Sequence, residues 1–389
     1  MDRETDVGNR VLGLVAFLLA LAILPYAQAG LHLGAETLVV ADGLPVDVIG
    51  YSVPCFADWN DDDLPDLIVG EGGGVYAGKV RVYLNAGTSG EPLFHDNAFY
   101  AQSKGADLSV PGSGCLGAFP RMVDWNGDEL MDLLVGQADG KIKIFLNIGT
   151  IGEPTFDRGA FVQVGPTGGK TDISVGSRAT PSVVDWNNDG LKDMISGGMS
   201  GRIYVYLNTG SNQAPDFQTT AYARQNGVDL IVNSGRSSPC AGDFNNDDRK
   251  DLICGNTNGE LWLYPNVGTD AEPIFGDAVQ VEAADVPIDL AGTPRSRPFV
   301  CDWNADGKSD VLIGAADGQV HLYRGHCAGD VNHDGQTGIA DLAALLAAYG
   351  STAGEPAYDP GLDFDADGDV DLSDLAYLLS LYGCHAVVS

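Results

Sequence analysis

The sequence predicts an all-β fold, a five-bladed β-propeller closed by its N-terminal strand, followed by a small α-helical domain. One sequence unit recurs five times, with leading aspartates 58 to 66 residues apart, and near-constant spacing is typical of repeat architectures. The 52 glycines and 19 prolines indicate many turns and few long helices. The pattern changes after about residue 326, where two short apolar helices are expected.

The chain of 389 residues is strongly acidic, with 54 Asp and Glu against 21 Lys and Arg and a formal net charge of −33. Binding to nucleic acid requires clustered cations, so this composition argues against a nucleic-acid partner. Hydrophobic residues make up 44%, which is enough for a packed core and excludes an acidic disordered tail.

The first 29 residues predict a signal peptide. Residues 11–25 are almost all apolar, follow Arg10 and lead to a small-x-small cleavage pattern at residues 27–29. An uncleaved anchor is the alternative, but the run is shorter than the ~20 residues that a spanning helix needs. We therefore expect an extracellular or cell-surface protein with no membrane span after cleavage.

Each repeat unit predicts about four antiparallel strands, the content of one propeller blade. In the third unit, strands are expected at residues 181–185, 194–196 and 202–208, and a fourth after residue 217. The fifth unit stops after its third strand at residues 319–324. Residues 31–49 resemble the missing piece when compared with residues 156–164 and 171–175, so we expect the N-terminal strand to close the ring.

Between the first two strands of every unit lies a nine-residue loop rich in oxygen ligands. Calcium takes six to eight oxygen ligands, and such a loop offers side chains at positions 1, 3, 5 and 9 and a carbonyl at position 7. The predicted side-chain ligands are Asp58, Asn60, Asp62 and Asp66; Asp124, Asn126, Asp128 and Asp132; Asp185, Asn187, Asp189 and Asp193; Asp243, Asn245, Asp247 and Asp251; and Asp302, Asn304, Asp306 and Asp310. The alternative, polar turns without metal, leaves three aspartates repelling one another in each loop.

The loops differ at position 6, where a sharp turn is needed. Gly190 and Gly307 fill it in two loops, whereas Glu129 stands there in the second loop. Glu tolerates positive φ poorly, so the second loop is expected to bind calcium most weakly.

These loops and their spacing resemble the FG-GAP or VCBS repeats of integrin-like β-propellers, whose blades carry calcium loops. The resemblance covers residues 31 to about 326 and implies a propeller domain at 30–326. It implies a calcium-binding module with a binding or adhesion role.

An aromatic residue follows the leading aspartate in every unit: Trp59, Trp125, Trp186, Phe244 and Trp303. We expect these rings to pack between blades, because a ring fixed in every repeat fits a geometric role. The alternative is a set of stacking platforms for sugars.

The C-terminal residues contain two twelve-residue loops, each followed by a helix, at an offset of 33 residues. This plan closely resembles a type I dockerin, a paired half-EF-hand, and implies a domain at 327–389 that binds a cohesin-like protein. The side-chain ligands implied by the resemblance are Asp330, Asn332, Asp334 and Asp341, then Asp363, Asp365, Asp367, Asp371 and Asp374. The alternative is a calcium-folded appendage that binds nothing.

Seven cysteines leave at least one unpaired in a monomer. Cys327 and Cys384 bracket the C-terminal domain, and we expect a disulfide between them. Cys240 and Cys254 are equidistant from Asp247 on adjacent expected strands, which predicts a second disulfide.

Three arginines stand at the same place in their units, seven residues before the leading aspartate: Arg178, Arg236 and Arg295. They predict a cationic rim around one axial mouth, suited to an anionic sugar. The alternative is that each pairs with a nearby acid or a strand carbonyl.

Together these features predict an exported propeller with up to seven Ca²⁺ sites that acts as a non-catalytic binding or adhesion module. The six histidines form no metal-spaced pair, and no nucleophile or phosphate-loop motif is present in the sequence. The alternative function is a lectin or a polysaccharide-degrading enzyme, with an anionic or neutral polysaccharide as partner.

Overall fold

The computed structural model describes residues 31–383, except for 75–76, 246, 285, 328, 333–335 and 366. The expected signal peptide therefore lies outside the described residues. No helix in the described part of the chain is long and apolar enough to cross a membrane.

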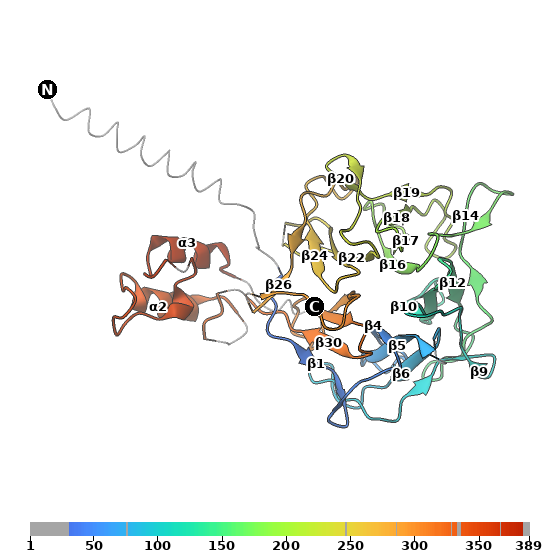
Figure 1. Ribbon diagram of the computed structural model, residues 1–389, viewed down its shortest axis with the longest axis horizontal. Coiled ribbons are helices and arrows are strands. Elements are labelled where there is room, and N and C mark those ends of the chain that lie inside the picture. The colour runs from blue at the N-terminus through green and yellow to red at the C-terminus, as the bar shows by residue number, and fades with distance from the viewer. Residues whose placement is uncertain are drawn as a thin grey trace.

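Five four-stranded antiparallel sheets surround a central axis, so the predicted five-bladed β-propeller is confirmed (Figure 1). Blade 1 contains β4 (Tyr51–Ala57), β5 (Asp66–Gly72), β6 (Val80–Tyr83) and β7 (Phe99–Tyr100). Blade 2 contains β10 (Phe119–Val123), β11 (Asp132–Gly136), β12 (Ile142–Phe145) and β13 (Ala160–Phe161). Blade 3 contains β16 (Thr180–Val184), β17 (Asp193–Gly197), β18 (Ile203–Tyr206) and β19 (Ala221–Tyr222). Blade 4 contains β22 (Ser238–Gly242), β23 (Asp251–Gly255), β24 (Leu261–Tyr264) and β25 (Val279–Gln280).

Blade 5 is built from both ends of the propeller sequence. It contains β28 (Arg297–Cys301), β29 (Asp310–Gly314), β30 (Val320–Tyr323) and β1 (Thr37–Leu38). β1 pairs antiparallel with β30, with Thr37 opposite Leu322, so the N-terminal strand closes the ring as predicted. The N-terminal segment and the corresponding segment of blade 2 each contain a Gly-Ala pair, at residues 34–35 and 159–160. In blade 2, Ala160 is opposite Ile144, which is equivalent to Leu322 in blade 5, so aligning the two pairs would place Ala35 opposite Leu322. Thr37 is opposite Leu322 instead, and the register is therefore shifted by two residues.

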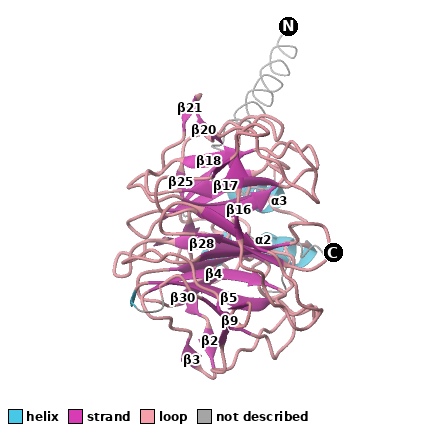
Figure 2. Cartoon of the chain, turned by 90° about the vertical axis from the view of Figure 1, so that its right-hand side faces the viewer, coloured by secondary structure: helices cyan, strands magenta, loops and turns pink. Residues whose placement is uncertain are grey.

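The first strand of each blade lies nearest the axis and the fourth lies outside (Figure 1). Seen at 90° to the axis, the strands run across the thickness of a disc, and loops cover both of its faces (Figure 2). The second strands are buried along their whole length, as in the Asp193–Gly197 strand, so each blade depends on its neighbours for burial.

A hairpin made of two short strands, each of two residues, follows the fourth strand of each blade. These hairpins were not predicted from the sequence. The hairpins are β2 (Val40–Ala41) with β3 (Leu44–Pro45), β8 (Gln102–Ser103) with β9 (Ala106–Asp107), β14 (Gln163–Val164) with β15 (Thr171–Asp172), β20 (Arg224–Gln225) with β21 (Val228–Asp229), and β26 (Glu282–Ala283) with β27 (Val286–Pro287). Each forms a parallel bridge to the next blade, as Ser103 does to Phe156.

Aromatic pairs join neighbouring blades, so the prediction that the repeated aromatics pack between blades is confirmed. The pairs, with ring-centroid distances, are Trp59 and Phe156 (5.3 Å), Trp125 and Phe217 (6.2 Å), Trp186 and Phe275 (5.8 Å), and Trp303 and Phe94 (5.8 Å). At the fifth junction, Leu33 takes the bridging place of the phenylalanine and shares a buried cluster with Phe244.

The C-terminal helices are α2 (Ile339–Ala348) and α3 (Leu372–Ser380), with the short 3-10 helix η3 (Pro360–Leu362) between them. They lie outside the ring, beside the blade that contains β1 and β30 (Figure 1). Their core contains Leu345, Leu362 and Leu378, which are buried against one another. The predicted small α-helical unit is therefore present.

The cysteines correct one prediction. Cys327 is disulfide-bonded, but its expected partner Cys384 lies outside the described residues. Cys240 and Cys254 are free, so the disulfide predicted between them is wrong. The reason is register: Cys240 is opposite Ile253, and Cys254 is opposite Pro239, so the two thiols are on opposite faces of the sheet. Cys240 lines a cavity of about 330 Å³ among the inner strands.

The buried side chain of His321 helps to hold the closing strand β1 in place through Glu36, which precedes β1. The His321 ring contacts Glu36 Oε1 through Nδ1 at 2.9 Å and Asp317 Oδ2 through Nε2 at 3.2 Å. The Tyr323 hydroxyl donates to Glu36 Oε2 at 3.0 Å. Burial lowers the pKa of His321, but the hydrogen bonds to Asp317 and Glu36 outweigh burial and raise that pKa above its ordinary value of 6.5.

We predict that closure weakens as His321 loses its proton. Because the folded-state pKa is raised, its stabilisation is complete below about pH 6.5 and is lost as pH rises through the folded-state pKa. Glu36→Gln should lower the free energy of unfolding by on the order of 1 kcal/mol near pH 6, since Glu36 is partly exposed, and by less at pH 8 to 9. Urea unfolding across this range measures the difference.

His95 provides the matched control, because its contact with Asp42 lies at the surface. His95→Gln should leave the pH profile unchanged. A Glu36→Gln effect that does not vary with pH would contradict the role given to His321.

Candidate metal centres

The five predicted calcium loops connect the first and second strands of the blades, on one face of the ring. The aspartate at position 9 begins the second strand and is fully buried in all five loops. Its Oδ2 accepts from the backbone N–H of the position-2 aromatic, and its Oδ1 from the backbone N–H just after the third strand. In loop 1, Asp66 makes these contacts with Trp59 at 3.0 Å and Asn85 at 2.7 Å.

The same two contacts recur in every other loop. They join Asp132 to Trp125 and Asn147, Asp193 to Trp186 and Asn208, Asp251 to Phe244 and Asn266, and Asp310 to Trp303 and Gly325. Position 9 thus fixes the loop, the aromatic and the third strand relative to one another.

Burial of the position-9 carboxylates raises their pKa. The pKa of Asp66, Asp132, Asp251 and Asp310 rises to about 6, although the two backbone amides oppose the shift. Neighbouring aspartates of the loop add to the rise, and Asp193 shifts in the same direction. A divalent cation bound at the loop would favour the ionised form and lower these pKa values again.

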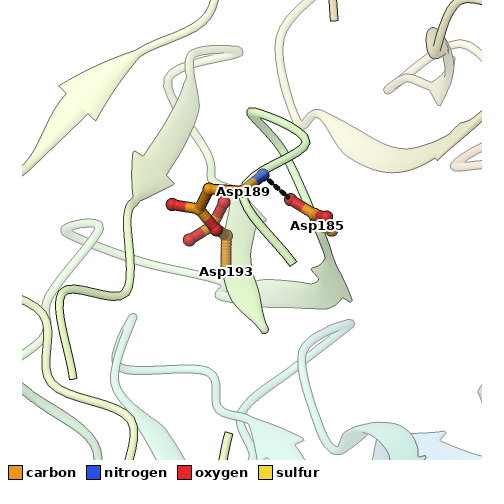
Figure 3. A group of neighbouring side chains, drawn as sticks. All are labelled: Asp185, Asp189 and Asp193. Carbon is orange, nitrogen blue, oxygen red and sulfur yellow. Dashed lines mark hydrogen bonds between the residues drawn. The ribbon is translucent and has the colours of Figure 1, made fainter. Parts of the chain in front are cut away.

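Positions 1 and 5 hold the loop in a tight turn. Asp185 Oδ1 accepts from the backbone N–H of Asp189 at 3.1 Å (Figure 3). Asp185 Oδ2 accepts from the backbone N–H of Gly190 at 2.9 Å. The carboxylates of Asp185, Asp189 and Asp193 each place an oxygen within 4.8 Å of the others, which is a geometry that can hold a metal ion.

The asparagine at position 3 tests whether the loops fit a cation. Its side-chain N–H donates to the position-5 aspartate in each loop, as Asn187 does to Asp189 at 3.0 Å. In loops 1, 3 and 5 the amide oxygens of Asn60, Asn187 and Asn304 are buried and accept no hydrogen bond. A buried acceptor without a donor is costly unless a cation satisfies it, so these three loops fit calcium.

Loops 2 and 4 differ from these three. The amide oxygens of Asn126 and Asn245 each accept a hydrogen bond from the backbone of the position-5 aspartate. Asp124 Oδ1 turns to Gly127, at 2.7 Å, in place of the position-5 amide. In loop 4, Arg249 forms an ion pair with Asp247 and competes with a cation for it.

The backbone at position 6 is left-handed in all five loops, as expected for the sharp turn predicted there. Glu129 has φ +71°, Asp63 +65° and Asp248 +62°, while Gly190 and Gly307 fill the position elsewhere. Because the left-handed region disfavours a residue with Cβ, Glu129 strains loop 2.

In the C-terminal unit, Asp341 and Asp374 are buried at equivalent places in the first turns of α2 and α3. Their Oδ1 atoms accept from the backbones of Val331, at 3.0 Å, and Phe364, at 2.6 Å. Asp363, Asp365 and Asp374 bring ligand oxygens within 4.8 Å of one another. Asp334 lies outside the described residues.

Of the other expected ligands in this unit, Asp371 is the N-cap of α3 and accepts from Ser373 at 2.6 Å. The first helix has Gly338 at this place and no side-chain cap. Asp330 and Asn332 lie on the loop before α2, and Asp367 lies on the loop before α3, as expected from the sequence.

The predicted arginine rim requires a correction. Arg178 is fully buried, so it cannot line a mouth. Its guanidinium donates to the carbonyls of Arg236 and Ser237 and to the Ser238 hydroxyl, because it reaches under the turn of the neighbouring blade. Arg236 and Arg295 are half-buried.

Comparison with known proteins agrees with the repeat. Residues 185–254 match the family described as FG-GAP-like repeat, so the chain contains such a repeat within a five-bladed β-propeller. No curated protein matches the chain.

Solved structures give weak similarity. A Photorhabdus luminescens Tc holotoxin pore (TccC3-D651A mutation) is 12% identical over 75% of this chain, with a TM-score of 0.38, and this chain spans 14% of that chain. BBS1N in complex with ARL6DN is 15% identical over 72% of this chain and 78% of that chain, with a TM-score of 0.33. Both scores are below 0.5 and carry no functional argument.

We predict that Glu129→Gly stabilises the protein by about 0.5–1 kcal/mol, because the relief of left-handed strain exceeds the entropy cost of glycine. Glu153→Gly is the control, since Glu153 is exposed in a nearby turn, carries the same charge and is not among the positive-φ residues. It should be neutral or destabilising. Equal effects of the two substitutions in chemical unfolding would contradict the strain.

Proposed function

We propose that the protein is an exported, calcium-stabilised, non-catalytic binding or adhesion module, held in place through its C-terminal unit. The propeller and its FG-GAP-like repeat support a binding module. The observation that carries the calcium role is the set of three buried, unsatisfied asparagine oxygens, each in a loop with three aspartates. Such an arrangement leaves both a charge and an acceptor for a cation to satisfy.

Calcium would strengthen the fold through the position-9 aspartates. These residues already bind the interblade aromatics and the third strands through backbone amides, as Asp193 does. A cation bound to the same carboxylate resists opening of the blade, and a ligand that binds only the folded state stabilises it by mass action.

We predict that added Ca²⁺ raises the melting temperature of the metal-stripped full chain, with about 2.7 kcal/mol per site at one hundred times Kd. Asn187→Ala should remove much of the contribution of loop 3, because it deletes a free acceptor. Asn126→Ala is the matched control: it loses the same amide donor to the adjacent aspartate, but its oxygen is already engaged.

Calorimetric titration of the three proteins checks this prediction. The calcium-induced rise in melting temperature should be smaller in Asn187→Ala and should change little in Asn126→Ala. No calcium uptake by the unmodified chain would contradict the calcium role itself, whereas equal losses in the two variants would contradict only the ranking of the loops.

The C-terminal unit is proposed to dock onto a cohesin-like protein. Apolar residues at equivalent places of the two helices are exposed: Ile339 with Leu372, Leu346 with Leu379, and Tyr349 with Tyr382. Ile339 is 73% exposed and Leu372 51%, so neither contributes to the core of the unit. Two similar exposed apolar faces are typical of a docking surface.

We predict that the full chain binds at least one member of a panel of immobilised, purified cohesin modules in calcium and not in chelator. Because the faces are similar, Leu372→Asp with Leu379→Asp should weaken binding severalfold. Adding Ile339→Asp and Leu346→Asp should abolish it. Val228→Asp, at an exposed propeller hairpin, is the control and should bind normally. Absence of binding to every module in calcium would contradict docking through this family.

A further inference from the structure

Four arginines meet at the end of the propeller axis away from the calcium loops. Arg178 precedes β16, Arg236 precedes β22, and Arg295 and Arg297 stand before and at the start of β28. They thus come from three blades and lie where the inner strands begin. The other two blades contribute Tyr51, at the start of β4, and Cys115, before β10.

Contacts across the axis hold these side chains together. Arg236 Nη1 lies 3.1 Å from Cys115 Sγ, although the two residues belong to non-adjacent blades. Arg297 Nη2 donates to the Cys115 carbonyl at 3.3 Å, and Arg295 donates to the Tyr51 hydroxyl.

Aromatic rings separate the guanidinium groups. Arg295 and Arg297 lie 4.9 and 5.0 Å from the centre of the Tyr51 ring. Arg178 and Arg297 lie 5.0 and 5.9 Å from the centre of the Phe119 ring. The rings fix the orientation of the guanidinium groups without neutralising their charge.

No carboxylate compensates the cluster. Among the residues that the structure describes, none of the four arginines has an ion pair within 4.0 Å, in a chain with 54 acidic residues. Arg178 and Arg297 are buried, and the Nε atom of each has no hydrogen-bond acceptor. Burial and the neighbouring arginines lower the pKa of both groups, that of Arg297 to about 9.

Backbone carbonyls and the Ser238 hydroxyl accept several N–H groups of Arg178 and Arg297, but they do not neutralise the charge. A buried guanidinium without a counter-ion is costly, and a cluster of them raises the cost through mutual repulsion. A bound anion removes both penalties. Guanidinium groups donate two parallel N–H bonds to a carboxylate, sulfate or phosphate, which makes a small oxyanion the complementary ligand.

We propose that Arg236 and Arg295, supported from beneath by Arg178 and Arg297, form a binding site for a small oxyanion group beside Cys115. The group is either a free inorganic oxyanion or the acidic substituent of a polysaccharide. The site deepens the proposed binding function by naming the ligand chemistry, and it depends on neither cohesin docking nor the ranking of the calcium loops.

Cys115 offers a direct report on the site. It is half-buried and free, and it contacts Arg236. Burial raises the pKa of the thiol, but the hydrogen bond from Arg236 and the charges of Arg295 and Arg297 outweigh burial and lower it. A reagent that reaches Cys115 must therefore enter the cationic field.

The test is alkylation of the calcium-loaded full chain, followed by peptide mapping at Cys115. Iodoacetate is an anion and iodoacetamide is neutral, so the ratio of their rates, normalised to free cysteine, should be on the order of tenfold above one. Sulfate should slow the reaction more than chloride at equal ionic strength. Arg236→Gln and Arg295→Gln should lower the rate ratio and abolish the protection.

Arg224→Gln is the control, because Arg224 is exposed on the β20–β21 hairpin away from the axis. It should behave like the unmodified chain. Oligogalacturonate distinguishes the source of the anion: protection at a lower carboxylate concentration than monomeric galacturonate indicates a polysaccharide, while protection by sulfate alone indicates a free oxyanion. Both outcomes support an oxyanion site.

A rate ratio equal to that of free cysteine, with no protection by sulfate beyond that of chloride, would overturn the proposal. If Cys115 does not react with either reagent, the melting temperature of Cys115→Ser in sulfate and in chloride at equal ionic strength decides. A sulfate-specific rise that disappears in Arg236→Gln supports the site, and equal melting in both salts overturns it. Calcium titration of the same samples is unaffected by either result, so failure of this site is distinguishable from failure of the calcium role.

Discussion

The buried aspartate that begins the second strand of every blade is the contact on which the rest of the propeller depends. Its two oxygens accept from the backbone beside the repeated aromatic and from the end of the third strand, as Asp193 does with Trp186 and Asn208. One aspartate side chain therefore sets the position of the aromatic side chain that packs against the next blade. In loop 3, Asp193 also brings an oxygen within 4.8 Å of oxygens of Asp185 and Asp189, so the contacts that position the blade and the proposed cation site share one residue.

Closure of the ring follows the same plan with different residues. At the fifth junction the chain has no phenylalanine to place against Phe244, and Leu33 occupies that place. Leucine has less area to bury than phenylalanine, so this junction gains less from apolar burial than the other four. In the other blades the fourth strand follows the third along the chain, whereas β1 is far from β30 in sequence and is held to it in part by the contact between His321 and Glu36.

The blade count and the places of the aspartate-rich loops could be predicted from the sequence because both repeat, and the closing strand could be predicted because the last repeat lacks its fourth strand. Spacing reports features that recur in every blade, but it does not report where one side chain points. Cys240 and Cys254 look equivalent around Asp247, yet the strand register puts them on opposite faces. Arg178 and Arg236 share a position in their units, yet Arg178 is buried beneath the turn that carries Arg236. Such differences depend on contacts between blades, which no single repeat encodes.

Arginines gather where three of the five inner strands begin, and aspartates gather where all five end. Each inner strand runs from the arginine end of the axis to an aspartate-rich loop, as β28 does between Arg297 and Asp302. Five residues of β-strand span about 17 Å, roughly twice the Debye length at physiological ionic strength. Carboxylates at one face therefore contribute little through solvent to the field at the other. The arginine cluster therefore keeps its own cationic field within a protein of net charge −33, and we expect the proposed calcium sites and the proposed oxyanion site to act independently of each other.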